Sequence, residues 1–380
     1  MSKTRTAFKE LFSGEPSLFI APGRINLIGE HTDYNQGFVM PAAIDKHFEF
    51  AVAANGTDQF NIHAIDLNDR VSFTKLELRR GNHWENYFMG VIDGFVRRGK
   101  NVSAVDVAFS SNIPTGAGLS SSAALCSGFG FALNEIFNCG LTRLDLALIA
   151  QESEHRFVGT MCGIMDMYAS LFSKKSSVML LDCRSNQHEY LPADFKDFEI
   201  LLVDTKVKHS LVTSGYNDRR SACEEGVRVI QQNNVGVNSL RDVSMKMLEA
   251  EKPHLGEEVF LRCFYVVKEI ERTQKAATCL RANDFKGFGR LMYQTHWGLS
   301  KDYGVSCEES DWLVSFADEN GVIGARQMGG GFGGCTINLI DGEKKSDFIE
   351  KVRRKYFAVF KKEPDFYSIK IANGVHSIDN

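Results

Sequence analysis

A short loop rich in glycine and serine joins a strand pattern to a helix pattern, and it constrains the fold more than any other segment. The strand pattern VDVAFSSNIP covers residues 105–114, and the loop TGAGLSSSAAL follows it. Four apolar residues then recur at every fourth position, as on one face of an amphipathic helix: Leu125, Phe129, Leu133 and Phe137. A strand, a flexible loop and a helix N-terminus in this order predict a fold that mixes sheets and helices.

The loop itself predicts an anion site. Gly116 and Gly118 lack a Cβ atom, so the backbone can approach a ligand closely. The helix that follows offers unpaired N–H groups and the positive end of its dipole, which together suit a di- or triphosphate. The three serines Ser120, Ser121 and Ser122 exceed what one N-cap needs. The alternative is a simple helix cap with small residues for packing.

The length of the chain predicts two domains. The chain has 380 residues, and single hydrophobic cores stop growing near about 250–300 residues. A weak break in composition at residues 185–198 marks the boundary, so we place the domains at 1–190 and 191–380. Two apolar segments within residues 176–205 are interpreted as consecutive strands, and residues 217–320 as mostly helical.

Charge and cysteine usage exclude several classes of protein. Lys and Arg number 44 against 48 Asp and Glu, so the chain lacks the basic surplus typical of a nucleic-acid binder. We find neither a secretory signal nor an apolar run long enough to span a membrane. Nine cysteines without a C-x-x-C pair predict reduced thiols in a cytoplasmic protein.

Two glycine motifs look like nucleotide sites but lack the required context. GGGFGGC at residues 329–335 matches G-x-G-x-x-G, yet a strand pattern follows it where a dinucleotide site needs a helix. It is either a bulged hairpin turn or a loop against another backbone or a ligand. Residues 94–100 begin like a P-loop, but Asn101 stands where Ser or Thr is needed, so we predict the end of a helix.

A polar loop near the N-terminus carries the remaining candidate ligands. Residues 21–37, APGRINLIGEHTDYNQG, place Arg24, Glu30, His31 and Asp33 close together. Carboxylates and an imidazole in such a loop could hold sugar hydroxyls or a metal ion. A solvated surface loop is the alternative on composition alone.

Together, in this order, the three segments resemble those of the GHMP small-molecule kinase superfamily. GRINLIGEHTDY is similar to the galactokinase signature. Further stretches fall where galactokinases have similar sequence: CGIMD at 162–166, LLDCRS at 180–185, SGYNDRR at 214–220 and LRDV at 240–243. The resemblance covers nearly the whole chain. It implies a two-lobed α+β fold, with mixed β-sheets packed by helices and the active site in the cleft between the lobes.

The resemblance also implies the reaction and its residues. Galactokinases transfer the γ-phosphoryl group of ATP to the anomeric C1 hydroxyl of α-D-galactose, giving galactose 1-phosphate and ADP. Asp166 matches the carboxylate beside that hydroxyl, interpreted as the catalytic base, and Arg24 matches its paired arginine. The positions that match sugar-binding residues are Glu30, His31, Thr32, Asp33, Gly163 and Tyr216.

The same comparison implies the nucleotide and metal sites. The positions that match the ATP phosphate loop are Gly116, Ala117, Gly118, Leu119, Ser120, Ser121 and Ser122. Ser122 and Glu154 match the Mg²⁺ ligands. Phosphoryl transfer depends mainly on positioning and charge stabilisation. Because Mg²⁺ prefers hard oxygen ligands and keeps waters, one serine and one glutamate suffice beside the phosphates.

Two alternatives to a galactokinase remain open. A kinase of another sugar, such as N-acetylgalactosamine, would need room for a C2 acetamide group. A non-catalytic sensor of galactose and ATP would have lost groups from the phosphate loop, whereas SSSAA, Asp166 and Arg24 are all present. We expect a cytoplasmic monomer with galactose and ATP as its small-molecule partners and neither nucleic acid nor membrane among them.

Overall fold

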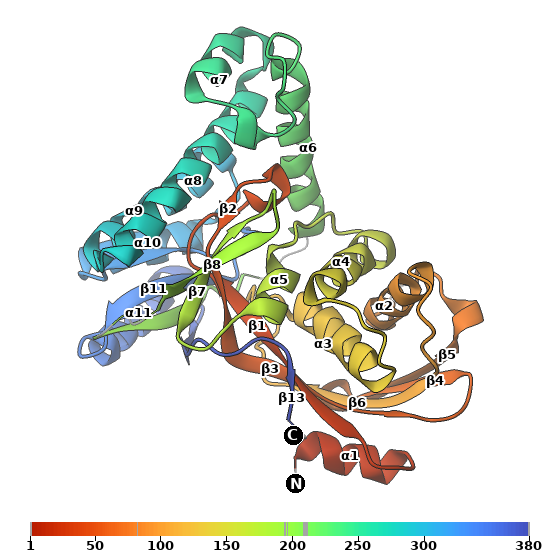
Figure 1. Cartoon of the computed structure of the whole chain (residues 1–380). Coiled ribbons are helices and arrows are strands. Elements are labelled where there is room, and N and C mark those ends of the chain that lie inside the picture. Colours follow the sequence, from red (N-terminus) through yellow and green to blue (C-terminus); the bar gives the residue numbers. More distant parts are fainter. Residues whose placement is uncertain (1, 82, 194, 196, 208–211, 379–380) are drawn as a thin grey trace.

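The computed structural model describes residues 2–81, 83–193, 195, 197–207 and 212–378, and its largest sheet lies in the first half of the chain (Figure 1). The spatial order is β13 (His376–Ser377), β1 (Ser17–Asn26), β3 (Pro41–Ala54), β6 (Val105–Ser111), β4 (Gln59–Ala64) and β5 (Asp69–Thr74). Neighbouring strands are antiparallel except β4 and β6, which are parallel.

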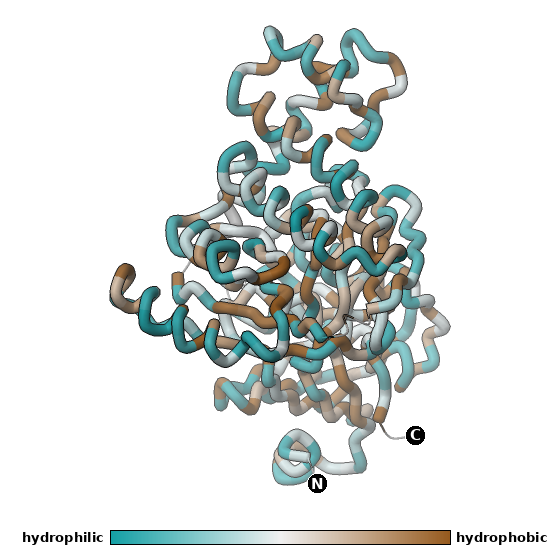
Figure 2. Tube along the Cα trace, turned by 90° about the vertical axis from the view of Figure 1, so that its left-hand side faces the viewer, coloured by the Kyte–Doolittle hydropathy of each residue, from teal (hydrophilic) through white to brown (hydrophobic). Residues whose placement is uncertain are grey.

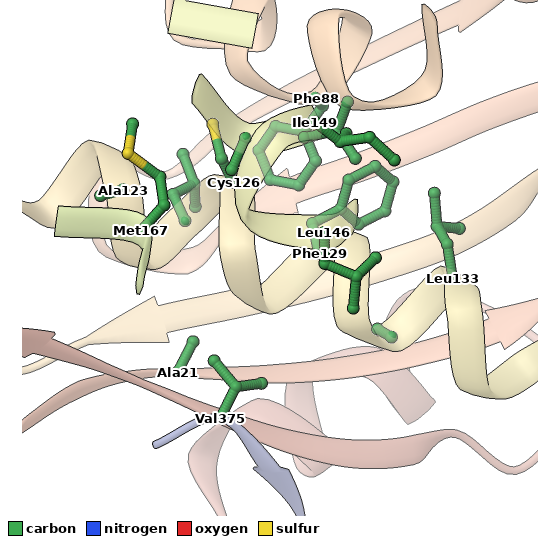
Figure 3. Close-up of a cluster of buried hydrophobic side chains, with 14 of the residues drawn as sticks. Ala21, Phe88, Ala123, Cys126, Phe129, Leu133, Leu146, Ile149, Met167 and Val375 are labelled. Atoms are coloured by element: carbon green, nitrogen blue, oxygen red, sulfur yellow. The ribbon is translucent and has the colours of Figure 1, made fainter. Parts of the chain in front are cut away.

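Four helices cover one face of this sheet: α2 (Glu85–Arg97), α3 (Ser121–Ile136), α4 (Arg143–Ser153) and α5 (Met165–Phe172). Figure 3 shows Phe88, Phe129 and Leu146 from three of these helices, with Ala21 of β1 below them. Helix α3 begins directly after the glycine–serine loop, which confirms the predicted order of strand, loop and helix. The P-loop-like residues 94–100 lie at the end of α2, as predicted.

Helix α1 (Lys3–Leu11) lies on the opposite face of the sheet, as Figure 1 shows. Its Phe8 packs against Leu18, Ala51 and Ala108. These residues alternate along their strands with core residues such as Phe19, because successive side chains of a strand point to opposite faces. The sheet is therefore covered on both faces.

A second, antiparallel sheet is built from the C-terminal half. Its order is β10 (Gly324–Gln327), β11 (Cys335–Asp341), β9 (Phe198–Asp204) and β12 (Asp365–Ile369). Two helices cover one face, α10 (Glu308–Glu319) and α11 (Lys345–Phe360). On the other face, Leu202 and Ile337 share a core with Phe288 of α9 (Phe285–Gly298) and with Ile25 of β1. This shared core joins the two sheets.

A third sheet corrects one prediction. Its strands are β2 (Phe38–Val39), β7 (Ser177–Asp182) and β8 (Gln187–Pro192). The expectation that β7 and β9 are consecutive strands was wrong, because β8 lies between them. Most side chains of β8 are exposed or half-buried, so its composition resembles that of a linker. The domain division at residue 190 falls within β8 and stays a prediction.

The helices of the second half form an extension that projects from the sheets. It comprises α6 (Val212–Ile230), α7 (Met245–Glu251) and part of α8 (Glu257–Arg281), at the top of Figures 1 and 2. Its apolar side chains pack into a core of their own, with Ile230, Leu248 and Val266 among the members. Within the described part of the chain, every helix is too short or too polar to cross a bilayer. The predicted helical stretch and the α+β class are confirmed.

Candidate active site

The three sequence segments meet around a cavity of about 210 Å³. Most of the predicted site residues line it: Arg24, Glu30, His31, Asp33, Gly118, Ser120, Ser122, Glu154, Gly163, Asp166 and Tyr216. Five further residues line the cavity without having been predicted individually as site residues: Thr160, Cys162, Met165, Gly329 and Gly330. Of these, only Thr160 lies outside the motifs that the sequence analysis identified. The remaining predicted residues stand outside the lining set: Thr32, Gly116, Ala117, Leu119 and Ser121. Both halves of the chain contribute to the walls.

Arg24 and Asp166 form a two-pronged ion pair in this cavity. The Nε atom of Arg24 donates to Asp166 Oδ1 at 2.7 Å, and Nη2 donates to Oδ2 at 3.0 Å. The third nitrogen, Nη1, donates to the carbonyl oxygen of Gly118 at 2.7 Å. Burial alone would lower the pKa of Arg24, but the carboxylates of Asp166 and Glu30 outweigh burial and raise it. The guanidinium therefore fixes the carboxylate beside the glycine–serine loop.

Local backbone structure places both partners. The register of β1 against β3 shifts between Pro22 and Arg24, and such a bulge re-aims the side chain that follows it. The backbone N–H of Arg24 donates to the carbonyl oxygen of Leu119 at 3.1 Å, which holds the strand against the loop. Asp166 lies in the first turn of α5. A strand bulge and a helix start thus meet at the pair.

The glycine–serine loop has the backbone of an anion site. Gly116 and Gly118 have φ values of 77° and 73°, which glycine adopts without strain. Ser120 occupies the N-cap position of α3 with φ 55°, yet its hydroxyl does not cap the helix and donates to Asp166 Oδ2 instead. The interpretation of these serines as a simple cap is therefore wrong for Ser120. The N–H groups at the start of α3 are left without that side-chain acceptor.

The glycine-rich segment 329–334 packs against this loop. It is the turn between β10 and β11, and a Cβ atom on Gly329 would stand 3.3 Å from the carbonyl oxygen of Gly118. A Cβ atom on Gly334 would stand 3.8 Å from the backbone of Ala117. The sequence left open whether this segment is a hairpin turn or a loop packed against another part of the backbone. The structure shows that it is both.

Glu30 is anchored by an arginine that sequence reasoning missed. Arg326 of β10 is completely buried, and its Nη1 and Nη2 atoms each donate to Glu30 Oε1 at 3.1 Å. The backbone N–H of Gly329 donates to the same oxygen at 2.8 Å. These three bonds from described residues all fall on Oε1, so Oε2 remains for a ligand. Burial raises the pKa of Glu30, but Arg326 and Arg24 outweigh it and lower the pKa.

Asp33 and Gly163 are placed together by close packing. A Cβ atom on Gly163 would stand 2.0 Å from Asp33 Oδ2, so only glycine fits there. Burial raises the pKa of Asp33 to about 7, and the nearby charge of Asp166 acts in the same direction. Backbone N–H groups of Tyr34 and Met165 oppose this shift. The cavity therefore holds a carboxyl group that ionises near neutral pH.

His31 faces the same cavity, whereas Thr32 does not. His31 is buried with φ 62°, and its Nδ1 atom lies 2.8 Å from the hydroxyl of Tyr34. The ring of Tyr216 lies 5.2 Å from the imidazole, centroid to centroid. The hydroxyl of Thr32 instead donates to backbone carbonyl oxygens within its own loop, those of Gly29 and Phe38. Thr32 thus holds the loop together from outside the cavity lining.

Ser122 and Glu154 form an oxygen-donor pair at the start of α3. Glu154 lies at the start of the π-helical turn Glu154–Val158 that continues α4, and its carboxyl group is buried. Burial raises its pKa to about 7, although the hydroxyl of Ser122 hydrogen-bonds to it and lowers the pKa. Among described residues no cluster of three or more His, Cys, Asp and Glu side chains could hold a metal. The pair fits an ion that takes most of its ligands from phosphate and water, as Mg²⁺ does.

A second cavity, of about 480 Å³, lies beside the same π-helical turn. Its walls are formed by Arg80, Gly81, His83, Trp84, Asn86, Tyr87, Phe157 and Val158. The backbone carbonyl of Tyr87 accepts hydrogen bonds from Ser153 at 3.1 Å and, more weakly, from Cys126 of α3. These contacts connect the aromatic wall to α3, the helix that begins after the glycine–serine loop.

Three family models match successive parts of the chain. The galactokinase galactose-binding signature matches residues 6–54, the GHMP kinase N-terminal domain matches 86–174, and the GHMP kinase C-terminal domain matches 276–358. A galactokinase of Thermotoga neapolitana is 42% identical over 94% of this chain and 99% of its own. A galactokinase of Clostridium acetobutylicum is 36% identical over 98% of this chain and 97% of its own.

Solved structures agree with the sequence relatives. The Lactococcus lactis galactokinase in complex with galactose superimposes with a TM-score of 0.94 at 31% identity, and the match covers 98% of both chains. A mevalonate kinase superimposes with a TM-score of 0.65 at 20% identity, over 94% of this chain and 99% of its own, which is a likeness of fold alone.

Proposed function

The chain belongs to the galactokinase family of GHMP kinases and is an ATP-dependent sugar kinase, and we propose from this premise how its residues act. The substrate is galactose, the product is galactose 1-phosphate, and the reaction takes place in the cavity around Asp166. Asp166 accepts a hydrogen bond from the C1 hydroxyl and takes its proton as the oxygen attacks the γ-phosphorus. Arg24 holds this carboxylate in place and stabilises the negative charge of the transition state.

One observation carries this proposal: Arg24 links Asp166 to Gly118 of the phosphate loop through a single guanidinium. A base and a phosphate site held by one rigid group can bring the hydroxyl and the phosphorus into line. Phosphoryl transfer gains most of its rate from such positioning and from charge stabilisation.

The carboxylates of Glu30 and Asp33 and the imidazole of His31 would hold the sugar hydroxyls. Glu30 presents Oε2, because its other oxygen is occupied by Arg326 and Gly329. Gly163 allows Asp33 to approach, and Tyr216 closes the wall beside His31. Galactose differs from glucose by its axial O4, so an acceptor aimed there would reject glucose by leaving a buried polar group unpaired.

Ser122 and Glu154 would hold Mg²⁺ together with the phosphates of ATP. When bound, Mg²⁺ neutralises negative charge on the phosphate groups. The residues Gly116 to Ser122 would surround these phosphates with backbone N–H groups at the positive end of α3. Glu154 would bind the ion as a carboxylate, the form that a nearby cation favours over the effect of burial.

The second cavity would take the adenine base. Trp84 and Tyr87 offer aromatic surface on which a flat base can lie, and the cavity shares the π-helical turn after Glu154 with the phosphate site. Replacement of Trp84 by Ala should raise the KM for ATP and leave the KM for galactose unchanged. An equal rise of both constants would speak against this placement.

We also propose a cytoplasmic monomer. All nine cysteines are free thiols, which suits a reducing compartment. The cavity is lined by residues of one chain, so a single copy suffices for the reaction. Light scattering coupled to gel filtration would test the monomer.

The deciding experiment measures ATP consumption with Mg²⁺ and galactose, glucose or N-acetylgalactosamine, together with product analysis for a sugar 1-phosphate. We expect turnover with galactose, and a kcat reduced by about 10²–10⁴-fold in Asp166→Asn. Asp347→Asn, a change in an exposed helical ion pair, is the matched control. A preference for N-acetylgalactosamine would show that galactose is not the substrate. Binding of galactose and ATP without turnover would indicate a sensor.

A further inference from the structure

A row of polar side chains leads from His31 into the helical extension. The Nδ1 atom of His31 lies 2.8 Å from the hydroxyl of Tyr34, which lies 2.7 Å from the hydroxyl of Tyr303. The hydroxyl of Tyr303 in turn lies 3.4 Å from the sulfur of Cys223. Tyr303 ends the π-helical turn Leu299–Tyr303 after α9, and Cys223 belongs to α6. Three distant segments of the chain therefore meet in one buried row.

The chemistry of these groups determines which member of each hydrogen-bonded pair donates and which accepts. Each hydroxyl has one proton, so only one of each pair can donate. A phenol is a better proton donor than a neutral imidazole N–H, and an imidazole nitrogen is a better acceptor than a phenol oxygen. The hydroxyl of Tyr34 therefore donates to Nδ1 of His31. Its single proton is then used, so Tyr303 must donate to Tyr34.

The far end of the row is compatible with this direction. Once Tyr303 donates to Tyr34, its oxygen can only accept, and the thiol of Cys223 is a weak donor within reach. The side-chain amide of Asn35 hydrogen-bonds to the sulfur of Cys223. An amide donor occupies a lone pair of the sulfur and leaves the S–H proton for Tyr303.

A neutral imidazole whose Nδ1 accepts must carry its proton on Nε2. The Nε2 atom is buried and makes no hydrogen bond of normal geometry to the described residues, and His31 lines the sugar cavity. Burial lowers the pKa of His31 to about 4, although Glu30 and the backbone of Gly330 favour the protonated ring. The ring is therefore neutral at pH 7, and its tautomer decides what it offers to a ligand.

We propose that Tyr34 and Tyr303 are positioning residues that hold His31 in its Nε2–H tautomer, so that His31 donates a hydrogen bond to a sugar oxygen. This inference rests on the proposed sugar site. Glu30 and Asp33 can only accept from hydroxyl groups when ionised, and His31 then supplies the opposite polarity. Neither tyrosine lines the cavity, so both act on selectivity through the imidazole.

The test begins with the ligand-free protein, labelled with ¹⁵N at histidine. Long-range ¹H–¹⁵N correlation spectra distinguish the two tautomers, and His31→Gln assigns the signals. We expect Nε2–H in the wild type and a shift toward Nδ1–H in Tyr34→Phe, with a smaller shift in Tyr303→Phe. An Nδ1–H tautomer in the wild type would overturn the proposal, as would spectra that neither variant changes.

Kinetics supply a second readout. Tyr34→Phe should raise the KM for galactose about tenfold, the effect of one hydrogen bond in a buried network, with kcat and the KM for ATP nearly unchanged. Tyr293→Phe is the matched control, because its hydroxyl donates to the carbonyl of Val322 at 2.9 Å, outside the row. A changed tautomer with an unchanged KM would also overturn the proposal.

These readouts separate this inference from the proposed function. Absence of galactose turnover in the wild type would contradict the proposed function. The tautomer of His31 in the ligand-free protein would still show whether Tyr34 donates to His31, which is the basis of this inference. If Tyr34→Phe fails to fold, Tyr303→Phe removes only the distant hydroxyl and must still alter the spectrum.

Discussion

Glu30 and Arg326 form an ion pair between residues that are 296 positions apart in the chain. Both hydrogen bonds of the pair go to the same carboxylate oxygen, Oε1 of Glu30. Arg326 also donates to the backbone carbonyl oxygens of Leu27 at 2.8 Å and of Asn26. Tyr265 of α8 donates to the carbonyl oxygen of Glu30 at 3.0 Å. The C-terminal half thus fixes the conformation of the polar loop at residues 21–37 in the N-terminal half.

Loss of this anchor should be costly. We expect Arg326→Met to lower the free energy of unfolding by about 3–5 kcal/mol, because it leaves a buried carboxylate without its partner. Chemical denaturation would measure the change. The control Arg281→Met removes an exposed pair with Glu189 and should cost no more than about 1 kcal/mol. Equal effects of both changes would contradict a structural role for the buried pair.

Gly163 should tolerate no side chain. In Gly163→Ala the new Cβ atom would lie 2.0 Å from Asp33 Oδ2, so the carboxylate must move. A displacement of about 1 Å in a reacting site can reduce kcat/KM by about 10²-fold, and we expect a loss of this order for galactose. Gly130→Ala in α3 is the control, since its Cβ atom would stand 3.6 Å from the nearest side chain. Steady-state kinetics with galactose as the varied substrate would show the difference.

The two carboxyl groups with pKa values near 7 predict an unusual pH dependence. Burial raises the pKa of Asp33 from 3.8 and that of Glu154 from 4.5. The folded state therefore binds these protons more tightly than the unfolded state, and their contribution to stability falls as pH rises between about 4 and 7. Denaturation of the ligand-free protein across this range should show that the free energy of unfolding depends less steeply on pH in the double variant Asp33→Asn, Glu154→Gln than in the wild type.

Substrate binding should show the opposite trend, because the proposed contacts use the ionised carboxylates. The kcat/KM for galactose should therefore rise with pH up to about 7. At saturating ATP and Mg²⁺, a kcat/KM for galactose that is constant from pH 5 to 7 would contradict the proposed role of Asp33.

The proposed Mg²⁺ ligands make a separate prediction. Ser122→Ala and Glu154→Gln should each raise the Mg²⁺ concentration for half-maximal rate about tenfold or more, since the chain supplies few donors there. They should also reduce the rise in unfolding temperature caused by ATP with Mg²⁺. Ser127→Ala is the control, because this serine of α3 is buried and makes no hydrogen bond to the described residues. A similar effect of all three changes would indicate damage to the helix instead.

Local patterns predicted the site residues that share a segment with a motif. The strand, loop and helix around Gly118 follow from residues that are neighbours in the chain, and so does the polar loop with Glu30 and Asp33. The family resemblance added Asp166 and Glu154, whose separate segments show no local sign of chemistry. The structure places most of these side chains around one cavity.

Contacts between distant segments were not predictable in the same way. Arg326 and Tyr303 gain their roles from partners that are 296 and 269 positions away, and no local spacing encodes such pairs. One signal was present for Arg326: it is a charged residue in a short strand before the glycine-rich turn, and a buried charge needs a partner. The contact of Ser120 is a further example, because its position fits a helix cap while its hydroxyl donates to Asp166 of another helix.

The long-range anchor of Glu30 also sets an order of events during synthesis. The polar loop at residues 21–37 leaves the ribosome early, whereas Arg326 and Gly329 follow about 300 residues later, after strands β1 and β3 to β6 of the first sheet have been synthesised. Until they arrive, the carboxylate of Glu30 lacks its hydrogen bonds with Arg326 and Gly329, and the cavity wall that Gly329 and Gly330 form is missing. A nascent chain can therefore form the glycine–serine loop before the side chains proposed to hold the sugar are fixed in place, so the proposed sugar site is completed only after translation has passed the glycine-rich turn.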